Sequence, residues 1–291
     1  MRYGWMKYCG KEFSADDLQR IGMIIKENPD TNRTGISRLV CEEFHWYKPD
    51  GKLKDMSCRV ALLRMERDGI IKLPPPQNRN SNGKRYIRQT ATTKPGQAIT
   101  SSAGKLHDLK ISLVATKQMS SLWNEYIDRY HYIGYKPLPG AQLRYIVYSG
   151  QRILALLGFG AAAWKVVARD QFIGWTHDKR KSRLHLIVNN ARFLILPWVR
   201  SRNLASKILG LISKRLPSDW EDCYCYKPVI LETFVECNRF SGGACYKAAN
   251  WKYVGMTQGR GKLDRKHEAN LPKKYIFLYP LDDQFRQLLC N

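Results

Sequence analysis

The chain has 291 residues, with 49 Lys and Arg against 25 Asp and Glu, and a formal net charge of +24. An excess of this size opposes compaction by self-repulsion unless a polyanion neutralises it, which argues against an ordinary enzyme for small neutral substrates. Both halves of the chain are basic, so both are expected to contact the partner. We therefore expect a nucleic acid, above all DNA; a merely solvated basic surface is the alternative.

The composition also bears on domain number and compartment. A hydrophobic fraction of 44% supports packed cores, and the length suggests two domains. No segment has the run of apolar residues that spans a bilayer, and the first residues lack the apolar stretch of a signal peptide. These features predict a cytoplasmic protein with reduced cysteines and no membrane partner.

Residues 1–76 are predicted to form a winged helix-turn-helix domain. A capping-box pattern at Ser14 begins the first helix, a second helix follows Thr34, and a third starts near Asp55. Residues 70–73 read as a short strand before three prolines. In this fold the third helix lies in the major groove of DNA.

The outward side chains of the third helix are suited to phosphates and base edges. They are Lys54, Ser57, Arg59 and Arg64. A winged helix that binds another protein is the alternative.

Residues 77–105 are rich in Pro, Asn, Gly, Ser, Thr and Gln, which predicts a mobile basic linker or an extension of the wing. Lys84, Arg85 and Arg88 are expected to follow the phosphate backbone.

Residues 106–291 are predicted to form one α/β domain with a mixed sheet. The hydrophobic patterns predict these elements in chain order: a helix over 120–135, strands over 144–148, 152–161, 184–188 and 193–199, a helix over 204–216, a strand over 229–235, a short helix over 245–251, and strands over 253–256 and 274–279.

This order is similar to the GNAT acetyltransferase fold. Arg200-Ser-Arg-Asn203-Leu-Ala205 looks like that family's R/QxxGxG/A pyrophosphate loop, with Asn in the first Gly position. Asn tolerates a left-handed backbone, so a turn that holds an anion at a helix N-terminus is compatible with this sequence. However, the missing glycine and the bulk of Pro197-Trp198 would crowd coenzyme A, and we expect acetyl-CoA not to be the cofactor.

The segment from Ala244 to Gly255 resembles the short GNAT helix that carries a general-acid tyrosine. By that match Tyr246 takes the position of the acid, and Glu232 in the preceding strand is a possible base.

A resemblance to the DruA family covers nearly the whole chain. The strings that carry it are CRVALLRMERDGIIKLPPP, FIGWTHDKRKSRLHLIVNNARFLILPWVRSRNLASKIL, VILETFVE and CYKAANWKYVGMTQGRGK. That family includes a component of the Druantia anti-phage systems, and relatives occur in mobile elements with transposase-like annotation. The resemblance implies recognition or processing of DNA.

DNA cleavage or joining would need a nucleophile or a metal-activated water. Tyr246 is the candidate nucleophile, with a buried tyrosine that anchors its helix as the alternative. Glu232 and Asp170 are candidate catalytic carboxylates, and two converging carboxylates would bind Mg²⁺. Pairing of these carboxylates with neighbouring arginines is the alternative, and no set of metal ligands is identified.

Cations of the second domain are expected to contact phosphate, several of them in the Gly-containing loop that follows Thr257. They are Arg192, Arg200, Arg202, Lys247, Arg260, Lys262 and Arg265.

The sequence thus favours a protein of a mobile element or defence system that binds and processes DNA, in a manner like a transposase, recombinase or nuclease. Double-stranded DNA is the expected partner, and single-stranded DNA is a further candidate. Other defence or transposition proteins and a second copy of the chain are further candidate partners. The alternatives are a non-catalytic subunit that recruits a helicase or another partner, and an acetyl-CoA-dependent N-acetyltransferase.

Overall fold

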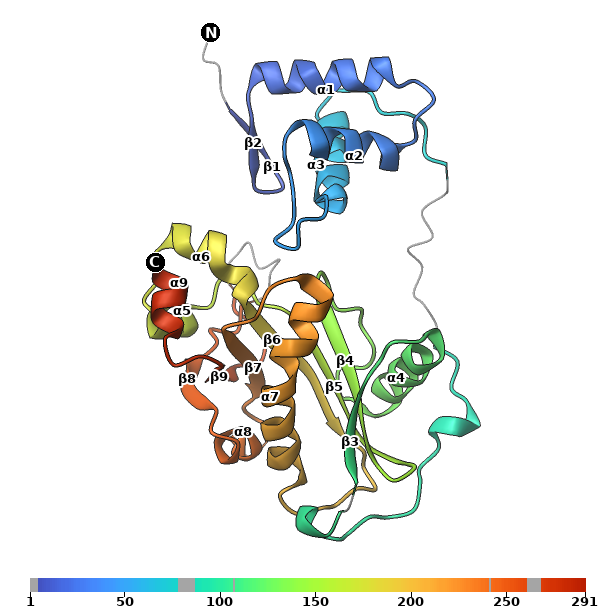
Figure 1. Ribbon diagram of the computed structural model, residues 1–291, viewed down its shortest axis with the longest axis vertical. Helices are drawn as coiled ribbons and strands as arrows, with labels where there is room; N and C mark the ends of the chain where they lie inside the picture. The colour runs from blue at the N-terminus through green and yellow to red at the C-terminus, as the bar shows by residue number, and fades with distance from the viewer. Residues whose placement is uncertain (1–4, 78–86, 107, 241, 261–267) are drawn as a thin grey trace. The chain divides into compact units, whose positions relative to one another are not determined.

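The computed structural model describes residues 5–77, 87–106, 108–240, 242–260 and 268–291. The chain divides into two compact units, Met1–Arg85 and Tyr86–Asn291, each with a core of its own (Figure 1). Within the described part of the chain, no helix combines the length and apolar character that a membrane span requires.

The first unit is a hairpin followed by three helices. Its elements are β1 (Met6–Tyr8), β2 (Lys11–Phe13), α1 (Ala15–Glu27), α2 (Arg33–Glu43) and α3 (Asp55–Arg67). Ser14 and Asp17 form the predicted capping box of α1, with hydrogen bonds of 3.1 and 2.7 Å between side chain and backbone. Phe13, Val40 and Met65 are fully buried where the hairpin and helices meet.

The three predicted helices are present, but the predicted strand over 70–73 is not formed, and a winged helix is not observed among residues 5–77. The hairpin of this unit precedes α1 instead of following α3. Residues 70–73 run along the core without a partner strand, and the backbone N–H of Leu73 donates to Glu66 Oε1 at 3.0 Å. Apolar alternation alone therefore indicated burial here, but not strand pairing.

The second unit contains a seven-stranded mixed sheet with the order β3-β4-β5-β6-β7-β9-β8. The strands are β3 (Leu109–Leu113), β4 (Gln142–Ser149), β5 (Arg152–Ala161), β6 (Ile187–Ile195), β7 (Ile230–Glu236), β8 (Lys252–Met256) and β9 (Lys274–Pro280). The helices are α4 (Lys117–Tyr130), α5 (Val167–Ile173), α6 (His177–Arg183), α7 (Leu204–Tyr224), α8 (Ala244–Ala248) and α9 (Phe285–Cys290).

Helices α4 and α7 cover opposite faces of this sheet. Arg144 of β4 stacks on Trp123 of α4, whereas the next residue, Tyr145, meets Arg215 of α7. Neighbouring residues of a strand point to opposite faces, so the two helices lie on either side. The pairing of β6 with β7 is parallel, and the other neighbouring strands are antiparallel.

Residues 87–106 belong to the second unit and do not form the predicted mobile linker. The hydroxyl of Thr93 donates to the buried carboxylate of Glu125 in α4 at 2.6 Å, and Thr90 also donates to Glu125. Tyr130 donates to the carbonyl of Thr93 at 2.7 Å. The Thr residues that made this segment look like a linker are the ones that bind it to α4.

The predicted strands over 184–188 and 193–199 are one strand, β6, preceded by α6 and a turn of 3-10 helix at Leu184–Leu186. Helix α7 also continues to Tyr224, past Pro217, where the sequence suggested an end at residue 216.

Candidate functional site where strands β6 and β7 separate

Strands β6 and β7 pair over only part of their length. Their parallel ladder joins Ile187 to Ile230 and ends with Asn189 opposite Glu232. Both strands continue beyond this point, to Ile195 and Glu236. Beyond Asn189 and Glu232, strands β6 and β7 are not paired with each other, which leaves a gap at the centre of the sheet. The facing edges of the two strands can bind other groups there.

A β-bulge in β6 lies at the same place. Gly158 of β5 is opposite Arg192, and the next residue, Phe159, is opposite Asn190, so Ala191 is the extra residue. The bulge places Asn190 on the α7 face, where it accepts a hydrogen bond from Tyr246. Arg192 lies on the α4 face, because Gly158 and Arg192 share a row with Arg144.

Tyr246 of α8 is buried at this gap. Its hydroxyl donates to Asn190 Oδ1 at 2.8 Å and accepts a hydrogen bond from Thr233 Oγ1 of β7 at 3.4 Å. The ring stacks on Phe277 and meets Trp251 edge-on. Burial raises the pKa of Tyr246 above its ordinary value, so the hydroxyl stays protonated at neutral pH. A protonated, buried phenol is a hydrogen-bond donor and a poor nucleophile.

The loop between β6 and α7 holds the predicted Arg200–Ala205 motif. Asn203 has φ 64° and ψ 4°, the left-handed conformation for which glycine is usual. Its side chain makes no capping hydrogen bond, so it does not satisfy the amide groups in the first turn of α7. Arg200 and Arg202 are exposed on either side of Ser201. The loop therefore places two exposed cations at the N-terminus of α7.

The segment before β3 holds this loop in place. The N–H of Arg200 donates to the carbonyl of Ile99 at 2.8 Å, and Ile99 donates to the carbonyl of Trp198 at 2.9 Å. Lys207 of α7 donates to the carbonyl of Ala103 at 2.9 Å. These contacts fix the backbone on which Arg200 and Arg202 stand.

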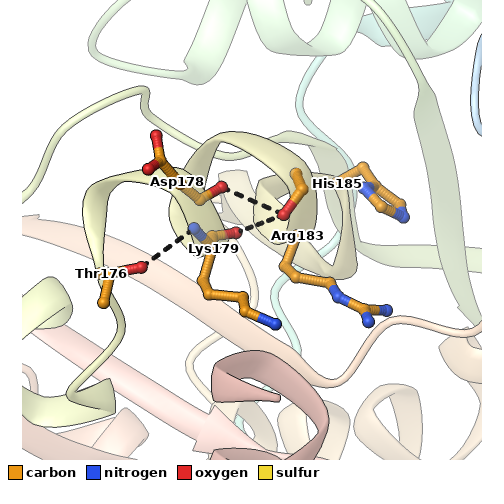
Figure 2. A pocket seen from close by; sticks show the side chains of 6 residues that line it. Thr176, Asp178, Lys179, Arg183 and His185 are labelled. Atoms are coloured by element: carbon orange, nitrogen blue, oxygen red, sulfur yellow. Dashed lines mark hydrogen bonds between the residues drawn. The ribbon is translucent and has the colours of Figure 1, made fainter.

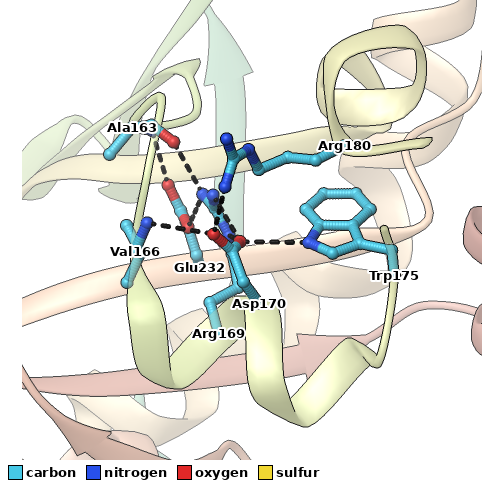
Figure 3. Close-up of polar contacts among 7 residues, drawn as sticks. All are labelled: Ala163, Val166, Arg169, Asp170, Trp175, Arg180 and Glu232. Atoms are coloured by element: carbon cyan, nitrogen blue, oxygen red, sulfur yellow. Dashed lines mark hydrogen bonds and ion pairs between the residues drawn. The ribbon is translucent and has the colours of Figure 1, made fainter. Parts of the chain in front are cut away.

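Glu232 and Asp170, the two predicted catalytic carboxylates, belong to a buried ionic cluster with Arg169 (Figure 3). Arg169 Nη1 lies 2.9 Å from Glu232 Oε2, and its Nη2 lies 2.9 Å from Asp170 Oδ1. Arg180 and the indole of Trp175 also donate to Asp170, at 3.1 Å each. Burial raises the pKa of Glu232, and the positive charge of Arg169 opposes that effect.

This cluster corrects the predicted catalytic group. Thr233 contacts Tyr246, and the adjacent Glu232 therefore points to the other face of β7. Tyr246 and the two carboxylates do not converge on one site. Among the described residues, no group of three or more His, Cys, Asp and Glu side chains is placed to hold a metal ion. The arginines around Asp170 and Glu232 satisfy these carboxylates, as the alternative interpretation anticipated.

Helix α6 borders an open pocket of about 650 Å³ (Figure 2). Its lining residues are Thr176, Asp178, Lys179, Ser182, Arg183 and His185. Thr176 caps the helix by accepting from the N–H of Lys179 at 3.2 Å, and Ser182 donates to the carbonyls of Asp178 and Lys179 at 3.1 Å. These polar groups stabilise the helix itself, and the pocket brings no reactive pair together.

The remaining predicted cations are spread over both units. Arg64, Arg88, Lys247 and Arg260 are exposed, and Lys54 and Ser57 are half-buried. Arg59 lies 3.7 Å from Asp55, which offsets its charge, and Arg192 is buried in the sheet instead of facing solvent. Lys84, Arg85, Lys262 and Arg265 lie outside the described residues.

Arg169 and His131 were not predicted from the sequence to be functional residues. Arg169 stands directly before Asp170, and an Arg-Asp pair in an apolar segment is a signal for a buried ion pair. His131 gave no such signal, because its neighbour Arg192 is 61 positions away and lies on another element.

Comparison with known proteins decides the family. A model of the Druantia protein DruA family matches residues 64–271. The chain belongs to the DruA family. The match begins within α3 and includes β6, α7, β7 and α8, which confirms the resemblance seen in the sequence. Among curated proteins, no relative matches this DruA-family chain.

Solved structures similar to this chain are GNAT acetyltransferases. Arabidopsis thaliana NAA60, solved with acetyl-CoA, is 12% identical, with 59% of this chain and 98% of that chain covered and a TM-score of 0.42. An N-acetyltransferase from Staphylococcus aureus Mu50 is 12% identical, with coverages of 60% and 100% and a TM-score of 0.38. Spermidine N-acetyltransferase from Vibrio cholerae is 9% identical, with coverages of 49% and 67% and a TM-score of 0.31.

These structures correct two predictions. They are named as acetyltransferases and not as transposases, recombinases or nucleases, which stands against the prediction of DNA strand cleavage or transfer. NAA60 and two further similar structures were solved with acetyl-CoA or CoA, which stands against the expectation that acetyl-CoA is not the cofactor. The seven-stranded mixed sheet of the second unit resembles the GNAT fold.

Proposed function

We propose that the α/β domain binds acetyl-CoA and transfers the acetyl group to an amine. The observation that supports this most directly is the left-handed Asn203 at the start of α7, directly after the exposed Arg200 and Arg202. The objections to coenzyme A were crowding at Asn203 and the bulk of Pro197-Trp198. The exposed side chain and the glycine-like backbone of Asn203 answer the first of these objections.

The residues of the loop fit the pyrophosphate of coenzyme A. Arg200 and Arg202 supply positive charge, and the first amides of α7 point along the helix axis toward a bound anion. Acetyl-CoA, when bound, supplies an activated acetyl group. Tyr246 holds a proton at Oη at neutral pH, and we assign it as the proton donor of the site. Asn190, which accepts its hydrogen bond at 2.8 Å, fixes the direction of the hydroxyl.

Removing the two loop arginines tests the cofactor assignment. Isothermal titration calorimetry should show saturable acetyl-CoA binding by the wild-type chain, weakened about 10- to 100-fold per residue in Arg200→Gln and Arg202→Gln. Each lost contact is a charge-assisted hydrogen bond, worth about 1.5–3 kcal/mol. Tyr246→Phe should keep the affinity and lower the rate at which free thiol is released from acetyl-CoA in the presence of an amine.

Arg152→Gln is the matched control for the loop, because Arg152 is an exposed cation at the first position of β5. It should bind acetyl-CoA as the wild type does. Asn203→Gly should also bind normally, since glycine adopts the same backbone conformation. The proposal fails if the wild type shows no saturable binding, or if Arg152→Gln weakens binding as much as Arg200→Gln.

We also propose that the first unit binds a polyanion such as DNA, without chemistry on its strands. Arg64 is an exposed cation on α3 and forms no ion pair with another described residue, so it is available to a phosphate. Arg64→Gln should weaken DNA binding and reduce the slope of log affinity against log salt by about 1. Arg20→Gln is the control, because Arg20 is already paired with Glu43 and Glu27. Equal slopes for wild type and Arg64→Gln would exclude this contact.

Other protein partners, a second copy of the chain and the cytoplasmic location remain predictions from the sequence.

A further inference from the structure

Arg192 is a buried cation without a carboxylate partner. It is only 9% exposed, and among the described residues it takes part in no ion pair. Its Nη1 donates to the adjacent carbonyl of Ala191 at 2.7 Å, and its Nε is buried without an acceptor. An uncompensated buried charge destabilises a fold, and buried charges in proteins are usually paired. The missing partner points to a ligand with negative charge.

The surroundings of Arg192 are built to accommodate its side chain. A Cβ at Gly158, directly across on β5, would lie 3.3 Å from the Cβ of Arg192 and 3.0 Å from the ring of Trp123. Only glycine leaves this space free. Arg144 stands on the far side of Gly158 in the same cross-strand row, but its guanidinium donates to Asn124 at 3.0 Å and stacks on Trp123. Neither arginine has a carboxylate partner, but Arg144 is only half-buried, whereas Arg192 is buried and its Nε has no acceptor.

His131, the residue that follows α4, adds a second donor beside Arg192. Its Nδ1 accepts from the N–H of Ile133 at 3.3 Å, so the neutral ring carries its proton on Nε2. Burial, together with the charge of Arg192, lowers the pKa of His131 to about 4, which keeps the ring neutral at pH 7. A neutral imidazole N–H and a guanidinium are both donors, which is the combination that an oxyanion requires.

The end of β7 borders the same place. Arg239 lies over the ring of Tyr132 at 4.7 Å, and Phe240 meets that ring edge-on at 5.6 Å. Glu236 is paired with Arg239 at 3.7 Å and forms no ion pair with Arg192. The ring of His131 stacks on the ring of Tyr132 at 4.8 Å. His131 and the residues that follow β7 therefore meet around Tyr132.

We propose that Arg192 and His131 bind an oxyanion, a carboxylate or phosphate group, of the molecule that accepts the acetyl group. The assignment of this ligand as the acceptor rests on the proposed acetyltransferase function. The anion site itself is inferred from the buried, unpaired guanidinium of Arg192 and the neighbouring imidazole of His131.

The test uses the full chain in the Arg200→Gln/Arg202→Gln background, which removes the proposed pyrophosphate loop as a competing anion site. Inorganic phosphate and acetate are added separately at constant ionic strength, with chloride as the reference. Thermal unfolding gives Tm, and the ¹H–¹³C signal of the His131 ring reports local binding. We expect phosphate or acetate to raise Tm above the chloride value and to shift the His131 signal, and the more effective anion identifies the group.

Arg192→Met should lose both responses. Without added anion it should raise Tm by about 2–4 °C, because removing an unpaired buried cation stabilises the fold. Arg144→Met, the matched control on the same face, should keep both anion responses. Retention of the His131 shift and the Tm response in Arg192→Met would overturn the proposal.

Failure of this site and failure of the acetyltransferase proposal give different results. With the loop arginines intact, Arg192→Met should bind acetyl-CoA as tightly as the wild type. If the chain binds no acetyl-CoA but still shows the Arg192-dependent response to anions, the anion site is supported. Its assignment to the acetyl acceptor is then wrong.

Discussion

Arg169→Met is expected to lower the free energy of unfolding by about 3–5 kcal/mol. The guanidinium is fully buried and donates to Glu232, Asp170 and the carbonyl of Ala163. Methionine fills a similar volume, but Glu232 would lose the one charged partner that it has among the described residues and would remain buried. Asp170 is less affected, because Arg180 and Trp175 also donate to it. Chemical denaturation of the full chain, followed by fluorescence, measures the change.

A matched variant separates this effect from the loss of any cation. Lys227 pairs with Glu221 at 3.2 Å on the surface, and Lys227→Met should change stability by at most about 1 kcal/mol. The double variant Arg169→Met/Glu232→Leu should recover part of the loss, because it removes both charges. If Arg169→Met is as stable as Lys227→Met, Arg169 does not hold the cluster together.

Gly243→Ala is expected to destabilise the chain by about 2–5 kcal/mol. Gly243 precedes α8 with φ 68°, and a left-handed backbone costs other residues about 1–2 kcal/mol. A Cβ at this position would also lie 2.5 Å from the ring of Phe277, which is fully buried and stacks on Tyr246. The forced repacking adds about 1–3 kcal/mol. Denaturation of the full chain measures the total.

Gly242→Ala provides the control for backbone strain. Gly242 has φ 56°, but a Cβ there would meet only the end of the Lys247 side chain, at 3.8 Å. This variant should lose about 1–2 kcal/mol, the strain alone. Equal losses of unfolding free energy in the two variants would show that Phe277 moves to accommodate the added methyl group. The close packing of Gly243 on Phe277 would then contribute little to stability.

The elements with strong local signals were predicted well. The capping box at Ser14 is present, and the strand–turn–strand pair over 144–161 corresponds to β4 and β5. The strand around Asn190 was not predicted, because two asparagines in succession suggest a turn. In the structure they continue β6, since β5 and β7 on either side supply the hydrogen bonds. The strand predicted over 70–73 is absent, because no neighbouring strand in the described residues pairs with it.

The amino-acid sequence was enough to predict the membership of the DruA family, the order of most elements in the α/β domain, and an asparagine able to adopt a left-handed turn before α7. The contacts between polar side chains, in contrast, depend on the three-dimensional arrangement of the strands. Glu232 and Thr233 are neighbours in sequence, but the alternation of a strand sends one to Arg169 and the other to Tyr246. The bulge at Ala191 likewise separates Asn190 from Arg192. Such contacts join residues about 60 positions apart and depend on strand register, which local sequence patterns do not encode.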